Sequence, residues 1–222
     1  MFTSLKIAWF RRLLRSRKIT DRRKAVSGLG KVAGAAAGGL LDIAFQDPEP
    51  EVRWSALVAL IDRKSPSLQD QLKHARYDPN PLVRLAALRH DLNEGSAIAM
   101  ACAIHSVKDS NEAIRDLAID ALTSTFKGQP KAALAMLKLA NHGSGWDSWE
   151  AKRRMHMFSN DTMREALRQE QLEKLAQEGL KRLERDRQDA LDRRLGRDSL
   201  VERMQHSSFP DSRGQSDRSV MN

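Results

Sequence analysis

The sequence predicts an all-α fold: a right-handed α-solenoid of about five helical hairpins, followed by one long charged helix. Three observations lead to this prediction. A motif recurs at a spacing of 31 residues, turn residues open each copy, and an amphipathic helical pattern follows each turn. A period of about 20–50 residues is typical of solenoids, because one helical hairpin cannot bury its apolar face alone whereas stacked hairpins can.

The repeat is clearest in three segments of the same layout. They read DPEPEVRWSALVAL (47–60), DPNPLVRLAALRHD (78–91) and DSNEAIRDLAIDAL (109–122). Proline has no backbone N–H and clashes with the preceding helical turn, so the first two segments must begin as turns. Apolar residues then recur at i, i+4, i+7 and i+8, which is one face of a helix. In the first segment these are Val52, Ala56, Ala59 and Leu60.

A second apolar pattern lies upstream of each turn, for example at Leu40, Leu41 and Ala44, so each unit is expected to be two helices. The hairpins are predicted near residues 3–31, 34–62, 65–93 and 95–125, with an atypical capping unit at 129–158. The solenoid then occupies residues 1–158, the long helix 159–205, and a polar, serine-rich and disordered tail 206–222. The aspartate that opens each motif is expected to cap the second helix of its unit or the turn before it.

The motif resembles HEAT-like repeats of the short bacterial type, the kind found in phycobilin lyases. The resemblance rests on Asp-Pro, two residues, Val-Arg and then Ala-Leu, and it covers about residues 3–125. It implies that the repeated polar residues form inter-repeat hydrogen-bond ladders, with Arg22, Arg53, Arg84 and Arg115 in register. Ser110 replaces the second residue of Asp-Pro in one copy. His90 and Asp91 stand where other copies have alanine and leucine, so the third unit is expected to shift its packing to Leu92.

The N-terminal segment carries the whole net charge of the protein. Residues 1–31 contain ten lysines and arginines against one acid, a net charge of +9, so the rest of the chain is balanced. Residues 4–15 align with the first helix of the next unit, which predicts a packed capping helix. The alternative is an amphipathic helix on an anionic membrane or on nucleic acid. Its contact residues would be Arg11, Arg12, Arg15, Arg22 and Arg23.

The C-terminal third has a different pattern. Thr162 and Glu165 form a possible capping box for a long helix over 162–195, which Gly196 is expected to end. Ion pairs at i, i+4 are predicted at Glu170–Lys174, Glu178–Arg182 and Asp189–Arg193. The apolar stripe is thin, so the helix is docked, dimerised or free. Trp146 and Trp149 are expected to pack in the atypical cap.

No catalytic, cofactor or metal motif is evident, so we predict that the protein is not an enzyme and has no cofactor. The stretch GLGKVAG (28–34) follows a basic helical segment instead of a strand, which argues against a dinucleotide site. The six histidines are scattered. Cys102 lies in an apolar helical segment and is expected to be a buried packing residue. A single cysteine cannot form an internal disulfide, which fits a cytoplasmic protein. No segment is long and apolar enough to span a membrane.

A solenoid without catalytic residues is typical of an interaction scaffold. Residues at equivalent positions of the second helices would form rows on the concave face, which changes from basic to acidic along the chain. We predict that this face binds another protein. The residues expected to bind it are Trp54, Val58, Leu85, Arg89, Asp116 and Asp120. The alternatives are attachment to anionic lipid or nucleic acid through the basic N-terminus, which would make the protein peripheral to a membrane, and a lyase-like role in protein modification.

Overall fold

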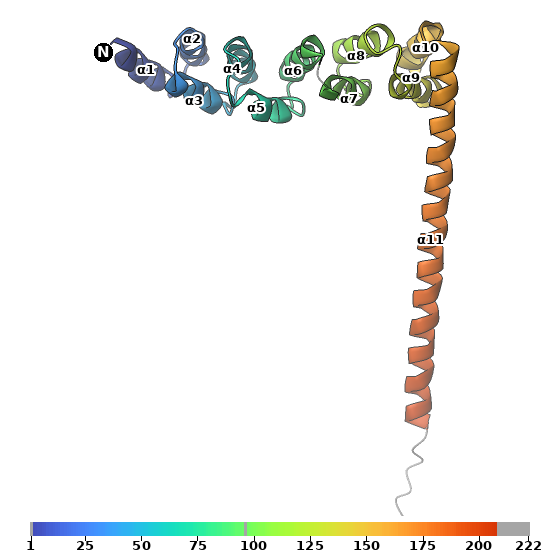
Figure 1. Ribbon diagram of the computed structural model, residues 1–222. Helices are drawn as coiled ribbons and strands as arrows, with labels where there is room; N and C mark the ends of the chain where they lie inside the picture. Colours follow the sequence, from blue (N-terminus) through green and yellow to red (C-terminus); the bar gives the residue numbers. More distant parts are fainter. Residues whose placement is uncertain (1, 96, 208–222) are drawn as a thin grey trace, which may run out of the picture. The chain divides into compact units, whose positions relative to one another are not determined.

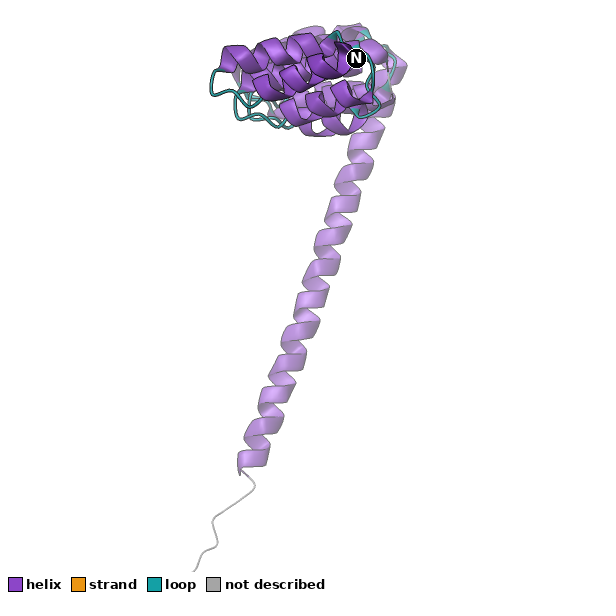
Figure 2. Cartoon of the chain, turned by 90° about the vertical axis from the view of Figure 1, so that its left-hand side faces the viewer, coloured by secondary structure: helices purple, strands orange, loops and turns teal. Residues whose placement is uncertain are grey.

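The computed structural model describes residues 2–95 and 97–207. The described residues form helices joined by short loops (Figures 1 and 2). The helices are α1 (Phe2–Leu13), α2 (Ile19–Gly30), α3 (Ala35–Ala44), α4 (Pro50–Asp62), α5 (Leu68–Ala75), α6 (Pro81–Glu94), α7 (Ala97–Ser106), α8 (Glu112–Ser124), α9 (Pro130–His142), α10 (Gly145–Arg154), the 3₁₀ turn η1 (Met155–Met157) and α11 (Asn160–Ser207). The chain divides into two units, residues 1–167 and 168–222. The prediction of an all-α solenoid followed by a long helix is confirmed.

The helices α1 to α10 stand in two rows within the first unit (Figure 1). Each hairpin contributes its first helix to one row (α1, α3, α5, α7, α9) and its second helix to the other (α2, α4, α6, α8, α10). Successive helices of the second row contact one another from α2 to α10, whereas the first row is more loosely packed. Closer packing of the second helices is the relation expected for the inner face of a curved solenoid.

A ladder of arginine–aspartate pairs connects successive hairpins, as the resemblance implied. Arg53 donates from Nε and Nη2 to the two carboxylate oxygens of Asp78, both at 2.8 Å. Its Nη1 donates to the carbonyl oxygens of Asp47 and Pro48, at 2.9 Å each. Asp78 also accepts from the backbone N–H of Asn80 at 2.8 Å. The aspartate therefore caps the turn, in the geometry of an Asx turn, while it holds the arginine of the preceding unit.

The same arrangement repeats along the array, at Arg22–Asp47 and Arg84–Asp109. A fourth pair joins Arg115 to Asp147, with Nε to oxygen distances of 3.0 and 2.8 Å. Asp147 lies in the first turn of α10 and follows its arginine by 32 residues, whereas the other pairs are 25 residues apart. The sequence repeat did not predict this last pair, because the register drifts in the capping unit.

The third unit was expected to shift its packing to Leu92, and Leu92 does pack, half-buried, against the second core cluster, but it does not replace Asp91 in the core. Asp91 keeps the position that corresponds to Leu60 and Leu122, and it is as buried as a core residue, with 4% of its surface exposed. Arg76 makes this possible by donating to both carboxylate oxygens of Asp91 at 2.8 Å. A buried carboxylate needs such a partner because an unpaired charge is costly in the core. The core divides into two clusters within α6, the helix that carries Asp91.

Helix α1 packs as the first helix of the first hairpin. Phe10 is buried and lies directly over Gly28 of α2, because a Cβ atom built on Gly28 would come within 2.2 Å of the Phe10 ring. Gly28, the first glycine of GLGKVAG, therefore allows the two helices to approach closely, so its role is in packing. Arg63, in the loop after α4, adds a further link by donating to the carbonyl oxygens of Leu29 and Val32 at the end of α2.

Helix α11 differs from the prediction at both ends. It begins at Asn160, and Ser159 caps it by accepting from the backbone N–H of Thr162 at 3.2 Å. It continues through Gly196 to Ser207, so Gly196 does not end it. The predicted pair Glu170–Lys174 forms at 3.1 Å, whereas Arg193 donates to the backbone carbonyl of Asp189. The predicted disordered tail lies, from residue 208 on, outside the described residues.

The capping unit contains an acid-sensitive contact. Hydrogen bonds from Arg153 and Arg154 hold the pKa of Glu150 at about 2, compared with its ordinary value of 4.5. A carboxylate whose pKa is lower in the folded state stabilises that state above its unfolded pKa, and this contribution is lost as the pH falls. We expect the melting temperature to drop between about pH 4.5 and about pH 2. Glu150→Gln should reduce this drop in thermal melts monitored by circular dichroism. If the melting temperature of Glu150→Gln fell as much as that of the unmodified protein, another carboxylate would be responsible for the acid sensitivity.

Candidate protein-binding surface

The second-row face of α4 and α6 carries a hollow that Trp54 helps to line. Trp54 and Val58 of α4 line one side of it, and Leu85 and Arg89 of α6 line the other. Trp54 has 39% of its surface exposed. Two features of the repeat bring these side chains together. Pro50 and Pro81 begin α4 and α6 at equivalent points of the repeat, and the Arg53–Asp78 pair of the ladder fixes the position of one hairpin relative to the next. The structure therefore brings together four of the six residues that the sequence predicted for partner binding.

Trp54 also faces a second hollow, on the side of α2. Trp54 and Val58 line it together with Arg23, Ser27 and Lys31. The two hollows share Arg23, Trp54 and Val58, and together we call them the furrow across α2, α4 and α6. An exposed tryptophan with aliphatic neighbours is typical of an anchor residue in a protein interface.

The rim of this furrow is predominantly basic. Its basic side chains are those of Arg23, Lys24, Lys31 and Arg89, all exposed. Its acidic side chains are Glu51 and Asp62. Among the described residues, none of these four cations forms an ion pair, so their charge is available to a partner. The sequence prediction missed Leu82, which also lines the furrow and is exposed. Its position three residues before Leu85 on the same helix face was the signal for it.

Asp116 and Asp120 lie apart from the furrow. They line another hollow, formed by α8 and α10, together with Trp146, Glu150 and Arg154. Asp120 is paired with Arg154 at 2.9 Å. The predicted change from a basic to an acidic rim along one binding face is therefore interrupted, because the capping unit neutralises Asp120.

Trp146 and Trp149 do not pack inside the capping unit, so that prediction was wrong. Trp146 has 56% of its surface exposed, and the two rings lie 4.7 Å apart. The guanidinium of Arg153 lies 5.6 Å from the Trp149 ring, a cation–π distance. The interior of the cap is instead built from small and aliphatic residues of α9, from Ala151 and from Phe158.

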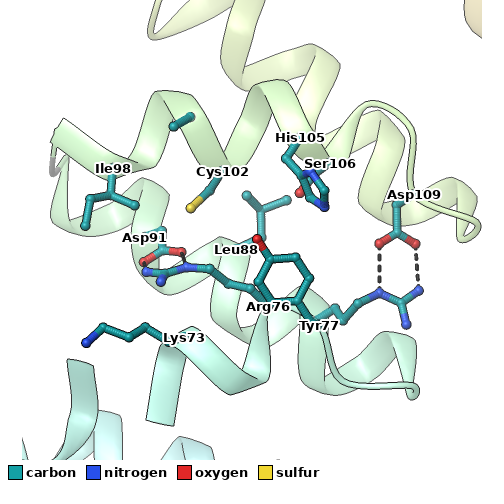
Figure 3. Close-up of a pocket in the computed structure, with 12 residues that line it drawn as sticks. Lys73, Arg76, Tyr77, Leu88, Asp91, Ile98, Cys102, His105, Ser106 and Asp109 are labelled. Carbon is teal, nitrogen blue, oxygen red and sulfur yellow. Dashed lines mark hydrogen bonds and ion pairs between the residues drawn. The ribbon is translucent and has the colours of Figure 1, made fainter. Parts of the chain in front are cut away.

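A cavity of about 300 Å³ lies on the first-row side, between α5, α6 and α7. Figure 3 shows Arg76 and Asp91 together on one side of it and Tyr77 with His105 on the other. Tyr77 and His105 are in edge-to-face contact, with 5.6 Å between ring centroids. Cys102 lines the cavity and is half-buried instead of fully buried. Burial and the neighbouring Asp91 raise the pKa of its thiol to about 11. A thiol of this kind is a poor nucleophile, because the thiolate is the reactive form.

The basic N-terminal residues divide into two groups. Arg11, Arg12, Arg15 and Arg23 are exposed. Arg22 is buried, and its guanidinium is bound to Asp47 at 2.7 and 2.9 Å. These hydrogen bonds hold the pKa of Arg22 above its ordinary value. Arg22 is therefore a ladder residue and has to be removed from the predicted anionic-surface contacts.

Comparison with known proteins shows a similarity over the first part of the array. Residues 7–90, from α1 through most of α6, match the family model of HEAT repeats. None of the curated proteins compared with the chain matches it. This matched part of the array is similar to HEAT repeats, and the α-solenoid architecture agrees with that similarity. The narrower resemblance to the short repeats of phycobilin lyases stays a prediction.

The described part of the chain offers no candidate for two other kinds of site. No group of three or more histidine, cysteine, aspartate or glutamate side chains there is placed to hold a metal ion. No described helix combines the length and the apolar character that crossing a bilayer requires.

Proposed function

We propose that the protein is a non-catalytic interaction scaffold that binds a segment of another protein in the furrow across α2, α4 and α6. The observation that carries this proposal is the exposed Trp54 between two hollows with aliphatic walls. HEAT repeats and related solenoids use extended concave surfaces for binding, and the furrow lies on the more tightly packed row.

The chemistry of the furrow favours one kind of partner segment. Its aliphatic wall, including Val58 and Leu85, would accept a large apolar side chain packed against Trp54. Arg23 and Arg89 stand at opposite sides of this wall and would pair with carboxylates. The expected segment therefore has an apolar anchor residue with aspartate or glutamate on both sides of it.

This proposal is tested by selecting peptides from a displayed random library on the purified full-length protein. Peptides with an apolar residue between acidic residues should be enriched. We expect Trp54→Ala to weaken their binding by about tenfold or more, as is typical of an aromatic anchor, and Arg89→Glu to weaken it through repulsion. Binding would be measured by fluorescence polarisation at moderate salt.

The matched control is Trp146→Ala, which removes a tryptophan that is also exposed but lies in the capping unit. This variant should bind the selected peptides as the unmodified protein does. Equal binding by Trp54→Ala and the unmodified protein, or enrichment of basic peptides, would refute the assignment of the furrow.

A further inference from the structure

Helix α1 has two apolar faces, of which the array covers one. Ile7, Phe10 and Leu13 pack against the core of the first two hairpins. Leu5 and Trp9 have 69% and 55% of their surfaces exposed, although one side of the Trp9 ring contacts Phe10, with 5.0 Å between ring centroids. Because they are four residues apart on a helix, they lie side by side. A helix that only capped the solenoid would be polar on its outer face, so the exposed pair requires another explanation.

Arg12 lies beside this exposed pair, and further unpaired cations occur on α1 and in the loop after it. Arg12 is three residues from Trp9 and seven from Leu5, which places it on the same helix face. The exposed basic residues of α1 and the following loop are Lys6, Arg11, Arg12, Arg15, Arg17 and Lys18. Within the ranges 2–95 and 97–207, none of them forms an ion pair. Asp21 is the sole acid in residues 1–31, and it accepts from Ser16 Oγ at 2.8 Å. The positive charge of these six basic side chains is therefore not compensated by nearby acids.

We propose that α1 binds the surface of a bilayer that contains anionic phospholipids. Leu5 and Trp9 would enter the boundary between headgroups and acyl chains, where tryptophan is favoured, and Arg11, Arg12 and Arg15 would contact lipid phosphates. The apolar pair decides between lipid and nucleic acid. Phosphates of either ligand would attract the arginines, but a leucine exposed beside them gains burial in a bilayer and has no counterpart along a nucleic-acid backbone.

This surface is separate from the furrow of the proposed scaffold. None of the residues Leu5, Trp9, Arg11, Arg12 and Arg15 lines either hollow beside Trp54. One chain could therefore bind a membrane through α1 and a protein through α4 and α6. Loss of one activity would not imply loss of the other.

The test is cosedimentation of the full-length protein with vesicles of phosphatidylcholine alone and of phosphatidylcholine mixed with phosphatidylserine. We expect binding to the mixed vesicles and weak binding to the neutral ones. The double variant Leu5→Ser/Trp9→Ser should lower the affinity for mixed vesicles by about tenfold or more. The triple variant Arg11→Gln/Arg12→Gln/Arg15→Gln should have a similar effect. All five side chains are exposed, so the variants should keep the melting temperature of the unmodified protein.

Two controls match these variants. Trp146→Ser removes an exposed tryptophan of the cap, and Lys127→Gln/Lys131→Gln removes exposed charge near the other end of the array. Neither should change vesicle binding. Equal binding to both vesicle types would overturn the proposal. So would binding that the arginine variants abolish and Leu5→Ser/Trp9→Ser leaves intact. Binding to a DNA or RNA duplex without binding to vesicles would also overturn it, in favour of a nucleic-acid surface.

Discussion

Replacing Asp78 with alanine is expected to lower the free energy of unfolding by about 3 kcal/mol, because it breaks a buried ion pair by removing one partner. Only 14% of the Arg53 side chain and 7% of the Asp78 side chain are exposed. The variant leaves the guanidinium without its carboxylate, and the backbone N–H of Asn80 loses its acceptor. The pair also joins two hairpins, so its loss should loosen the stack on both sides.

This effect should be measured by urea unfolding, followed by circular dichroism. Asp78→Asn separates the two contributions, since an asparagine oxygen can still accept from Asn80 but carries no charge to pair with Arg53. It should therefore be more stable than Asp78→Ala and less stable than the unmodified protein. The control is Asp70→Ala, which removes a carboxylate from the exposed pair with Lys73. Exposed pairs contribute little. Equal losses for Asp78→Ala and Asp70→Ala would show that the ladder does not stabilise the array.

The ladder could be predicted from the sequence because its residues recur with the repeat. Arginine and aspartate keep the same places in each unit, and the pairs therefore form at a constant separation of 25 residues. The final pair was not predictable in this way. Asp147 belongs to a capping helix that departs from the 31-residue register, so only the three-dimensional position of α10 shows that it replaces the missing turn aspartate.

The candidate binding furrow was also predictable where its residues recur with the repeat, and not where the repeat ends at the cap. Trp54 and Leu85 occupy equivalent positions on neighbouring second helices, so the repeat alone places them side by side. The same logic placed Asp116 in line with them. It did not indicate that Arg154 of the cap pairs with Asp120 at the far end of the array, where a different hollow forms. Contacts between a regular unit and an irregular cap carry no periodic signal.

The division of the core at α6 is explained by two positions at which the third unit differs from its neighbours. Arg76 occupies the place of Phe45 and Val107 in the neighbouring units, both of which are buried. Asp91 occupies the place of Leu60 and Leu122. The third unit has therefore exchanged two apolar core residues for an ion pair. Either change alone would be expected to disturb the stack, and the sequence prediction considered only the second.

Restoring the apolar pattern at both positions should stabilise the protein, whereas restoring it at one should not. Asp91→Leu alone leaves Arg76 without a partner, and we expect a loss of about 3 kcal/mol in the free energy of unfolding. The double variant Arg76→Phe/Asp91→Leu copies the second unit. Buried ion pairs can often be replaced by apolar residues without cost, or with a gain of about 1–4 kcal/mol. The double variant should therefore match or exceed the stability of the unmodified protein in urea unfolding.

Cys102 provides a second measurement that distinguishes a lost ion pair from general loosening. Its thiol pKa is about 11 because of burial and the nearby Asp91, while Arg76 acts in the opposite direction. Removing Asp91 alone should lower the thiol pKa and speed its reaction with a disulfide reagent at neutral pH. In the double variant neither charge remains, burial dominates, and the reaction should stay slow. Fast reaction in both variants would indicate that the cavity has opened. A double variant less stable than the unmodified protein would mean that the ion pair is better suited to this position than the apolar residues of its neighbours.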